Sequence, residues 1–201
     1  MSAPTIDLRF PHTWVAEILA QRPLILPSRS YTYPQAAEEV ERGALEVLIR
    51  PDTNPGAPGP SHLGTGDSHP FLATCALGFR DSSVPSGLWS SPNPQEICAV
   101  SGGYAYLIDT QAPERFTMLP LRPVMQIVPA PEAELLLFAG HHTILAWGKN
   151  GLAWQSARLS DEGVTITAVE AEKLRGLGWQ MMTDKEKPFA LDLKTGTLIF
   201  S

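Results

Sequence analysis

Two adjacent histidines, His141 and His142, are the side chains best suited to acid–base or metal chemistry in this sequence. A protein metal site needs three or four His, Cys, Asp or Glu ligands that converge on one point. Neighbouring residues of a strand point to opposite faces, so the two imidazoles could share an ion only from a turn. Because no HxH, HxxxH or CxxC spacing supplies further ligands, we expect no metal and no cofactor. One imidazole should cap a turn and the other pack at a sheet edge, with proton transfer or ligand binding as the alternatives.

Three tryptophans form the next group of candidates. Trp147 and Trp154 flank Asn150 and Gly151, a dipeptide that strongly favours a β-hairpin turn. We expect the two indoles to face each other across the hairpin and to pack in the core. The alternative is an aromatic platform for a ligand, to which Trp179 in "LGWQ" would add.

The sequence lacks a recognisable catalytic motif. Asp184 begins a charged run in "MMTDKEKPFALD", and such runs are usually solvated loops. The serine-rich segment 80–96 has no glycine elbow around a nucleophile, and no phosphate-binding glycine loop is present. An enzyme would need His141 or His142 within hydrogen-bond reach of Asp81 or Asp184, in a cleft. The candidate ligand-binding residues are therefore His141, His142, Trp147, Trp154, Trp179 and Asp184.

These residues lie after Pro70, in a region where the pattern of apolar runs and turn residues predicts strands. After Pro70, apolar runs of four to nine residues alternate with turns rich in Gly, Pro, Asn and Asp, as in an antiparallel β-meander. Grouped in fours, the runs suggest about three repeated units. The first unit comprises residues 71–79, 97–102, 104–110 and 116–120; the second 124–129, 134–139, 143–148 and 152–159; the third 164–169, 174–180, 189–193 and 197–200.

The phrase "FALDLKTGTLIF" and the repeated four-strand units resemble the blades of β-propellers, particularly the quinoprotein-like and WD-type blades, over residues 70–201. The resemblance implies a recognition scaffold. No cofactor residue of the quinoprotein family is matched, so no activity carries over. A closed propeller typically needs four or more blades. Either "LILPSRSYTY" and "LEVLIRP" make a fourth, or the units form a curled sheet or sandwich, or a partner chain completes the ring.

The first third of the chain reads differently. The apolar spacing of residues 11–21 predicts a short helix, and "TYPQAAEEVERGA" predicts a second, followed by a strand in "LEVLIRP". Residues 52–69 are dense in Pro, Gly and Ser and should form a flexible surface loop. We therefore expect a single domain of residues 1–201, with an N-terminal helix and strand segment (1–51), this loop (52–69) and the β-meander (70–201).

Net charge and composition exclude some classes of binding partner and location. A formal net charge of -6 without a basic run argues against nucleic acid, and no apolar run is long enough to span a bilayer. No export signal precedes the chain's first elements, so we expect a cytoplasmic protein whose two cysteines, Cys75 and Cys98, are buried thiols.

The sequence thus favours a non-catalytic binding or protein-interaction module. Loops 52–69, 80–96 and 181–187 would present a surface to a small molecule, a protein or a second copy of the chain. The alternative is a small hydrolase or lyase with a His/Asp site at the loop end of the strands.

Overall fold

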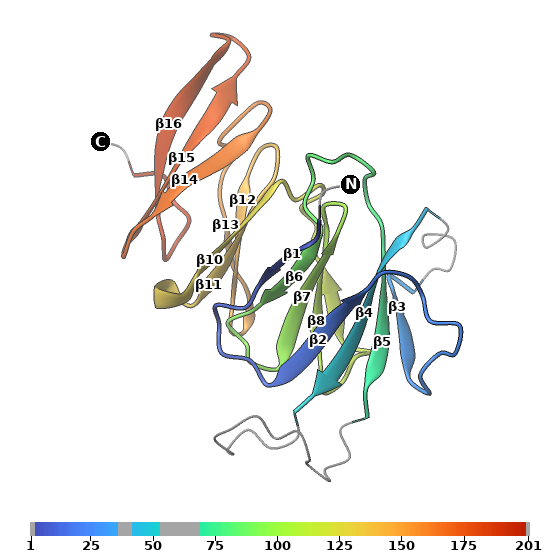
Figure 1. The fold of residues 1–201 in the computed structure, drawn as a ribbon. Coiled ribbons are helices and arrows are strands. Elements are labelled where there is room, and N and C mark those ends of the chain that lie inside the picture. Colours follow the sequence, from blue (N-terminus) through green and yellow to red (C-terminus); the bar gives the residue numbers. More distant parts are fainter. Residues whose placement is uncertain (1–2, 36–41, 53–68, 200–201) are drawn as a thin grey trace.

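The protein is mainly β, and its strands form four stacked sheets. The computed structural model describes residues 3–35, 42–52 and 69–199. Within those ranges it contains sixteen strands and a single three-residue 3-10 helix, η1 (Pro131–Ala133). The sheets follow one another in an open arc, with β2 to β5 at one end and β14 to β16 at the other (Figure 1).

Sheet 1, the sheet formed by β2 to β5, contains the strand β2 (Trp14–Leu19) in the segment 11–21, where a helix is predicted. Trp14, Ala16 and Ile18 face the core while Val15 is exposed, which is the two-residue period of a strand. In so short a segment the apolar positions also fit a helical period, so the sequence did not distinguish the two. Antiparallel pairing with β4 fixes the extended form. The first predicted helix is therefore wrong. The order of sheet 1 is β2 (Trp14–Leu19), β4 (Ala44–Pro51), β5 (Phe71–Ala76) and β3 (Ser30–Tyr33).

The second predicted helix, over residues 32–44, is also wrong where the structure describes it. Tyr33 ends β3 and Ala44 begins β4, while residues 36–41 lie outside the described residues. The predicted flexible loop, apart from Asp52 and His69, lies outside them as well. Strands β3 and β4 correspond to the two runs considered for a fourth unit, and both belong to sheet 1, where each of them pairs with β5.

The strands of sheet 2 differ from those of the first predicted unit. Its first antiparallel strand is β6, which lies inside the predicted loop 80–96, because the run beginning at Phe71 is taken by sheet 1. The N-terminal strand β1 adds to β6 in parallel. The order is β1 (Thr5–Asp7), β6 (Gly87–Ser90), β7 (Glu96–Ser101), β8 (Tyr104–Asp109) and β9 (Phe116–Met118).

Sheets 3 and 4 follow the second and third predicted units. Sheet 3 is a meander of β10 (Gln126–Ala130), β11 (Leu135–Ala139), β12 (Ile144–Gly148) and β13 (Gly151–Gln155). Sheet 4 contains β14 (Val164–Val169), β15 (Lys173–Gln180) and β16 (Lys185–Asp192). Its predicted fourth strand is reduced to one bridge between Leu191 and Leu198, and β16 takes in the second half of the predicted loop 181–187.

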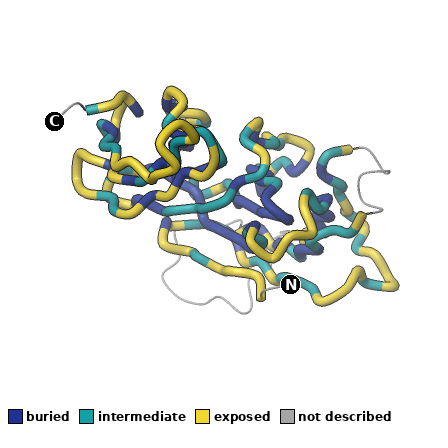
Figure 2. The backbone as a smooth tube through the Cα atoms, turned by 90° about the horizontal axis from the view of Figure 1, so that it is seen from above, coloured by how far each residue is buried: buried dark blue, intermediate teal, exposed yellow. Residues whose placement is uncertain are grey.

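Three apolar clusters fill the spaces between successive sheets. One joins sheets 1 and 2 around Phe71 and Tyr106, the next joins sheets 2 and 3 around Leu107 and Phe138, and the last joins sheets 3 and 4 around Leu137. Sheets 2 and 3 are therefore covered on both faces, which explains the continuously buried strands in the middle of the tube in Figure 2.

Cys75 and Cys98 are free and fully buried in these clusters, as predicted. Burial away from water disfavours the thiolate and raises the pKa of both thiols. Among the described residues, the structure forms no helix of the length and apolarity needed to traverse a bilayer.

Candidate functional site

His141 and His142 lie on the turn between β11 and β12, and both line a concave pocket of about 240 Å³. The turn is closed by a hydrogen bond from the Gly140 amide to the Thr143 carbonyl oxygen (3.0 Å). A Cβ on Gly140 would lie 2.6 Å from Leu121 Cδ1, so the start of the turn is in close contact with the Leu121 side chain. The turn thus packs closely on the β9–β10 connection, which forms the opposite wall.

The pocket is rich in hydrogen-bond donors. The β9–β10 connection contributes Arg122, which directly precedes Pro123, and the segment from the β11–β12 turn to β13 contributes Thr143 and Gln155. The Arg122 guanidinium also lies over the ring of Tyr104, 5.6 Å from its centroid, a cation–π contact that favours its position at the wall. Sequence reasoning missed Arg122 and Gln155, and no local pattern in the sequence marks either residue.

The two imidazoles are held differently. His142 Nδ1 lies 3.2 Å from the Ser160 carbonyl oxygen, which can only accept, so Nδ1 carries a proton and donates it in this hydrogen bond. The rings of His141 and His142 are 6.2 Å apart and inclined by 50°. Both therefore face the same pocket from a turn, where the sequence expectation placed one at a sheet edge.

Trp147 and Trp154 do not face each other. A β-bulge between Ala146 and Trp147 inserts one residue, so Trp147 pairs with Leu152 and Trp154 pairs with Ala146. One extra residue moves every later side chain to the other face of the strand. Trp147 consequently packs toward sheet 2 and Trp154 toward sheet 4, and the expectation of a shared aromatic face is wrong.

Each indole instead bonds to the neighbouring sheet. Trp147 Nε1 donates to the Glu96 carboxylate (2.7 Å), and Trp154 Nε1 donates to the Leu193 carbonyl oxygen (2.9 Å). Trp14 Nε1 donates to the Glu96 carbonyl oxygen (3.3 Å) from sheet 1. Both sheet 3 tryptophans are buried, at 7% exposure each. They connect sheets and offer little surface to a ligand.

Trp179 and Asp184 lie apart from the histidine pocket. Trp179 is half-buried on β15, opposite Glu186 of β16, and Asp184 occupies the exposed turn between these strands with a φ of 49°. Asp81 is in the β5–β6 connection, on the side of sheet 2 that meets sheet 1. The structure therefore brings together only two of the six predicted residues, His141 and His142.

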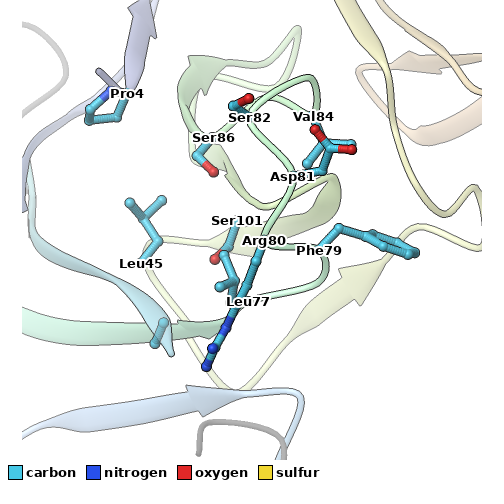
Figure 3. Close-up of a pocket in the computed structure, with 11 residues that line it drawn as sticks. Pro4, Leu45, Leu77, Phe79, Arg80, Asp81, Ser82, Val84, Ser86 and Ser101 are labelled. Carbon is cyan, nitrogen blue, oxygen red and sulfur yellow. The ribbon is translucent and has the colours of Figure 1, made fainter. Parts of the chain in front are cut away.

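A second, smaller cavity lies between sheets 1 and 2, beside the "SGG" turn of residues 101–103 (Figure 3). Its most deeply placed polar group is Ser101, with 1% exposure. Of the residues around this cavity, Asp81 was predicted from the sequence as a candidate, and Ser101 was not. Among the described residues, no group of three or more His, Cys, Asp or Glu side chains could hold a metal ion at either cavity or elsewhere.

No protein-family model and no curated protein matches the chain. Among solved structures, it is similar to the N-terminal domain of Nup159, with 13% identity and a TM-score of 0.38 over all of this chain and 54% of that one. A second is a complex of S. cerevisiae Dbp5 bound to Nup159, Gle1, IP6 and ADP, with 14% identity and a TM-score of 0.35 over 92% of this chain and 50% of that one. The chain thus spans about half the length of these structures.

Proposed function

We propose that the protein is a non-catalytic binding module that recognises an anionic group in the histidine pocket. The observation that carries this proposal is the composition of the pocket wall: one arginine, two histidines, Thr143 and Gln155, and no carboxylate among its described lining residues. No acidic side chain of the described lining neutralises these hydrogen-bond donors. Such a cluster of donors suits a carboxylate or phosphate ligand.

The chemistry at each side chain supports the same ligand. Arg122 supplies a permanently charged, forked donor. His142 donates Nδ1–H to the Ser160 carbonyl oxygen, which fixes the orientation of its ring at the pocket wall.

The hydrolase or lyase alternative receives less support. It requires an imidazole paired with Asp81, Asp184 or Glu186, and none of these carboxylates lines the histidine pocket. The partner of His142 Nδ1 is a backbone carbonyl, which orients the ring but does not stabilise an imidazolium as a carboxylate would.

We also infer that the scaffold is one domain of blade-like units in an open arc. Three successive clusters connect all four sheets without a break, and sheet 3 is a complete four-stranded meander. A cytoplasmic location is part of the same proposal, and the two free buried thiols support it because reducing compartments keep thiols unpaired.

Titration with citrate and with inorganic phosphate, followed by amide chemical shifts, tests the anion site. We expect saturable shifts at residues 140–143 and 121–122. Losing one charge-assisted hydrogen bond should weaken binding about tenfold in Arg122→Gln and about threefold to tenfold in His142→Gln. Arg175→Gln, which changes an exposed arginine of sheet 4, is the matched control and should leave affinity within about twofold.

Equal weakening in Arg122→Gln and Arg175→Gln would mean non-specific charge attraction and would contradict the proposal.

A further inference from the structure

The cavity between sheets 1 and 2 has a polar group without a partner. Ser101 is 1% exposed, and its Oγ makes no hydrogen bond to any described residue. A buried hydroxyl without a partner is unfavourable, and native proteins rarely leave one so. Something that binds in this cavity would therefore gain a hydrogen bond that the fold itself does not provide.

The cavity is a formed site with rigid walls. Residues 77–79 cross the "SGG" turn, and two backbone bonds hold them there: Gly78 N–H to the Ser101 carbonyl oxygen (3.0 Å) and Phe79 N–H to the Gly102 carbonyl oxygen (2.8 Å). A Cβ on Gly78 would lie 2.4 Å from the Tyr104 ring, so the crossing is closely packed. The space beside Ser101 is thus maintained by the backbone.

The lining defines the chemistry of a ligand. Leu45, Leu77 and Val84 give it apolar walls, and Ser86 and Ser101 add two hydroxyls. Ser86 Oγ accepts a hydrogen bond from the Gly102 amide (2.8 Å), so its own hydrogen can still be donated. In Figure 3, Ser101 lies between the Leu45 wall and residues 77–86, with Ser86 above it.

Charge is confined to the rim. The Arg80 guanidinium donates to the Arg42 carbonyl oxygen (2.8 Å), and Figure 3 places its end on the side of the cavity away from Ser82 and Ser86. Asp81 accepts a hydrogen bond from the Ser83 amide (2.8 Å), which helps to lower the pKa of its carboxyl. Both charges are therefore engaged in fixing the loop, and the interior favours a neutral ligand.

Size sets the remaining limit. The cavity measures about 100 Å³, against the roughly 150 Å³ of an apolar protein cavity that holds benzene. We propose that this cavity binds a small neutral molecule, or the end of a larger one, with an aliphatic body of four or so carbons and a single hydroxyl that pairs with Ser101 and Ser86. The site is separate from the histidine pocket and does not depend on anion binding there.

Two isosteric probes test the pairing: 2-butanol, and 2-methylbutane, in which a methyl group replaces the hydroxyl. Amide shifts of Gly78, Gly102 and Ser101 report binding. We expect the ratio of the 2-butanol affinity to the 2-methylbutane affinity to be about tenfold higher in the wild type than in Ser101→Ala, because only the wild type offers the Ser101 hydroxyl to the alcohol.

Ser101→Ala should fold normally, because Ser101 Oγ bonds to no described residue. Its melting temperature should equal or exceed that of the wild type, and Ser28→Ala, in the β2–β3 connection and outside the cavity lining, is the matched control for the probe titrations. Absence of saturable shifts, or the same probe preference in wild type and Ser101→Ala, would mean that the cavity holds only water and would overturn the proposal. A lower melting temperature in Ser101→Ala would assign the hydroxyl a structural partner and overturn it too.

Discussion

The two tryptophans of sheet 3 each connect it to a neighbouring sheet through an indole hydrogen bond, but the two acceptors differ in chemistry. Trp147 joins sheet 3 to sheet 2 by donating to the Glu96 carboxylate, and Trp154 joins it to sheet 4 by donating to the Leu193 carbonyl oxygen. Each also lies against a glycine of positive φ, Gly151 for Trp147 and Gly196 for Trp154. The inner junction therefore depends on a group that titrates, and the outer one depends on a neutral backbone turn.

The closeness of the two glycine contacts differs as well. A Cβ on Gly196 would lie 2.4 Å from Trp154 Cε3, whereas a Cβ on Gly151 would lie 3.8 Å from Trp147 Cη2. The outer sheet is covered on one face only and is held by a turn that closes directly on the indole. The comparison indicates that the outer junction relies on steric fit and the inner one on electrostatics.

Gly196→Val should produce the largest effect, because it breaks the steric fit. The substitution forces a β-branched residue to a φ of 69° and drives its Cβ into Trp154. We expect the free energy of unfolding, measured by urea denaturation, to fall by about 3–5 kcal/mol from strain and overpacking together.

The matched control for that experiment is Gly163→Val. Gly163 has a φ of 87° with nothing within 4 Å of an added Cβ, so it carries the strain without the collision. Gly163→Val should lower the free energy of unfolding by about 1–2 kcal/mol. Equal losses in the two variants would mean that the contact with Trp154 contributes nothing to the outer junction.

Gly151→Val should have an intermediate effect, because at the inner junction there is room beside Trp147. A φ of 106° makes valine strained at the hairpin turn, and we expect a loss of about 1–3 kcal/mol in the free energy of unfolding. His141→Ala, at the neighbouring turn, should change it by about 0.5 kcal/mol or less. Thermal melting of both variants checks the order, and a reversed order would contradict the structural role of the Asn150 and Gly151 turn.

The sequence was informative where one local signal decides the structure. Asn150 and Gly151 predicted the β12–β13 hairpin, which is confirmed, although only Gly151 takes a positive φ. The strand runs of sheets 3 and 4 were also found, because each run is bounded by its own turn residues. In "ALDLKTGT", Asp192 Oδ1 accepts hydrogen bonds from the Lys194 and Thr195 amides, a turn that depends on neighbouring residues alone.

The sequence was uninformative where a distant partner decides. Residues 14–19 have apolar positions compatible with either period, and pairing with β4 selects the strand. The bulge at Trp147 has no sequence marker, yet it sends Trp147 and Trp154 to opposite faces. The candidate sites were missed for the same reason: Arg122 lines one pocket with the histidines, and Ser101 is left without a hydrogen-bond partner, only because connections between different strands pack together.

The smallest expected effect concerns pH and tests the electrostatic half of the comparison. Burial disfavours the charged carboxylate and raises the pKa of Glu96, although hydrogen bonds from Trp147 and Ser91 partly oppose this. A raised pKa means that the folded state keeps its proton to a higher pH than the unfolded chain does. The contribution of Glu96 to stability is therefore present below the ordinary glutamate pKa and is lost as pH rises through the raised value.

Removal of each indole hydrogen bond should therefore respond differently to pH. Trp147→Phe takes a donor from Glu96, and its cost in free energy of unfolding should grow by about 1 kcal/mol from pH 4 to pH 8, because a bond to a charged acceptor is stronger than one to a neutral acceptor. Trp154→Phe removes a bond to a backbone carbonyl, so its cost should stay constant over the same range. In a Glu96→Gln background the pH dependence of Trp147→Phe should vanish. If it persists there, a group other than Glu96 titrates at the inner junction, and the two junctions do not differ in the way that their hydrogen bonds indicate.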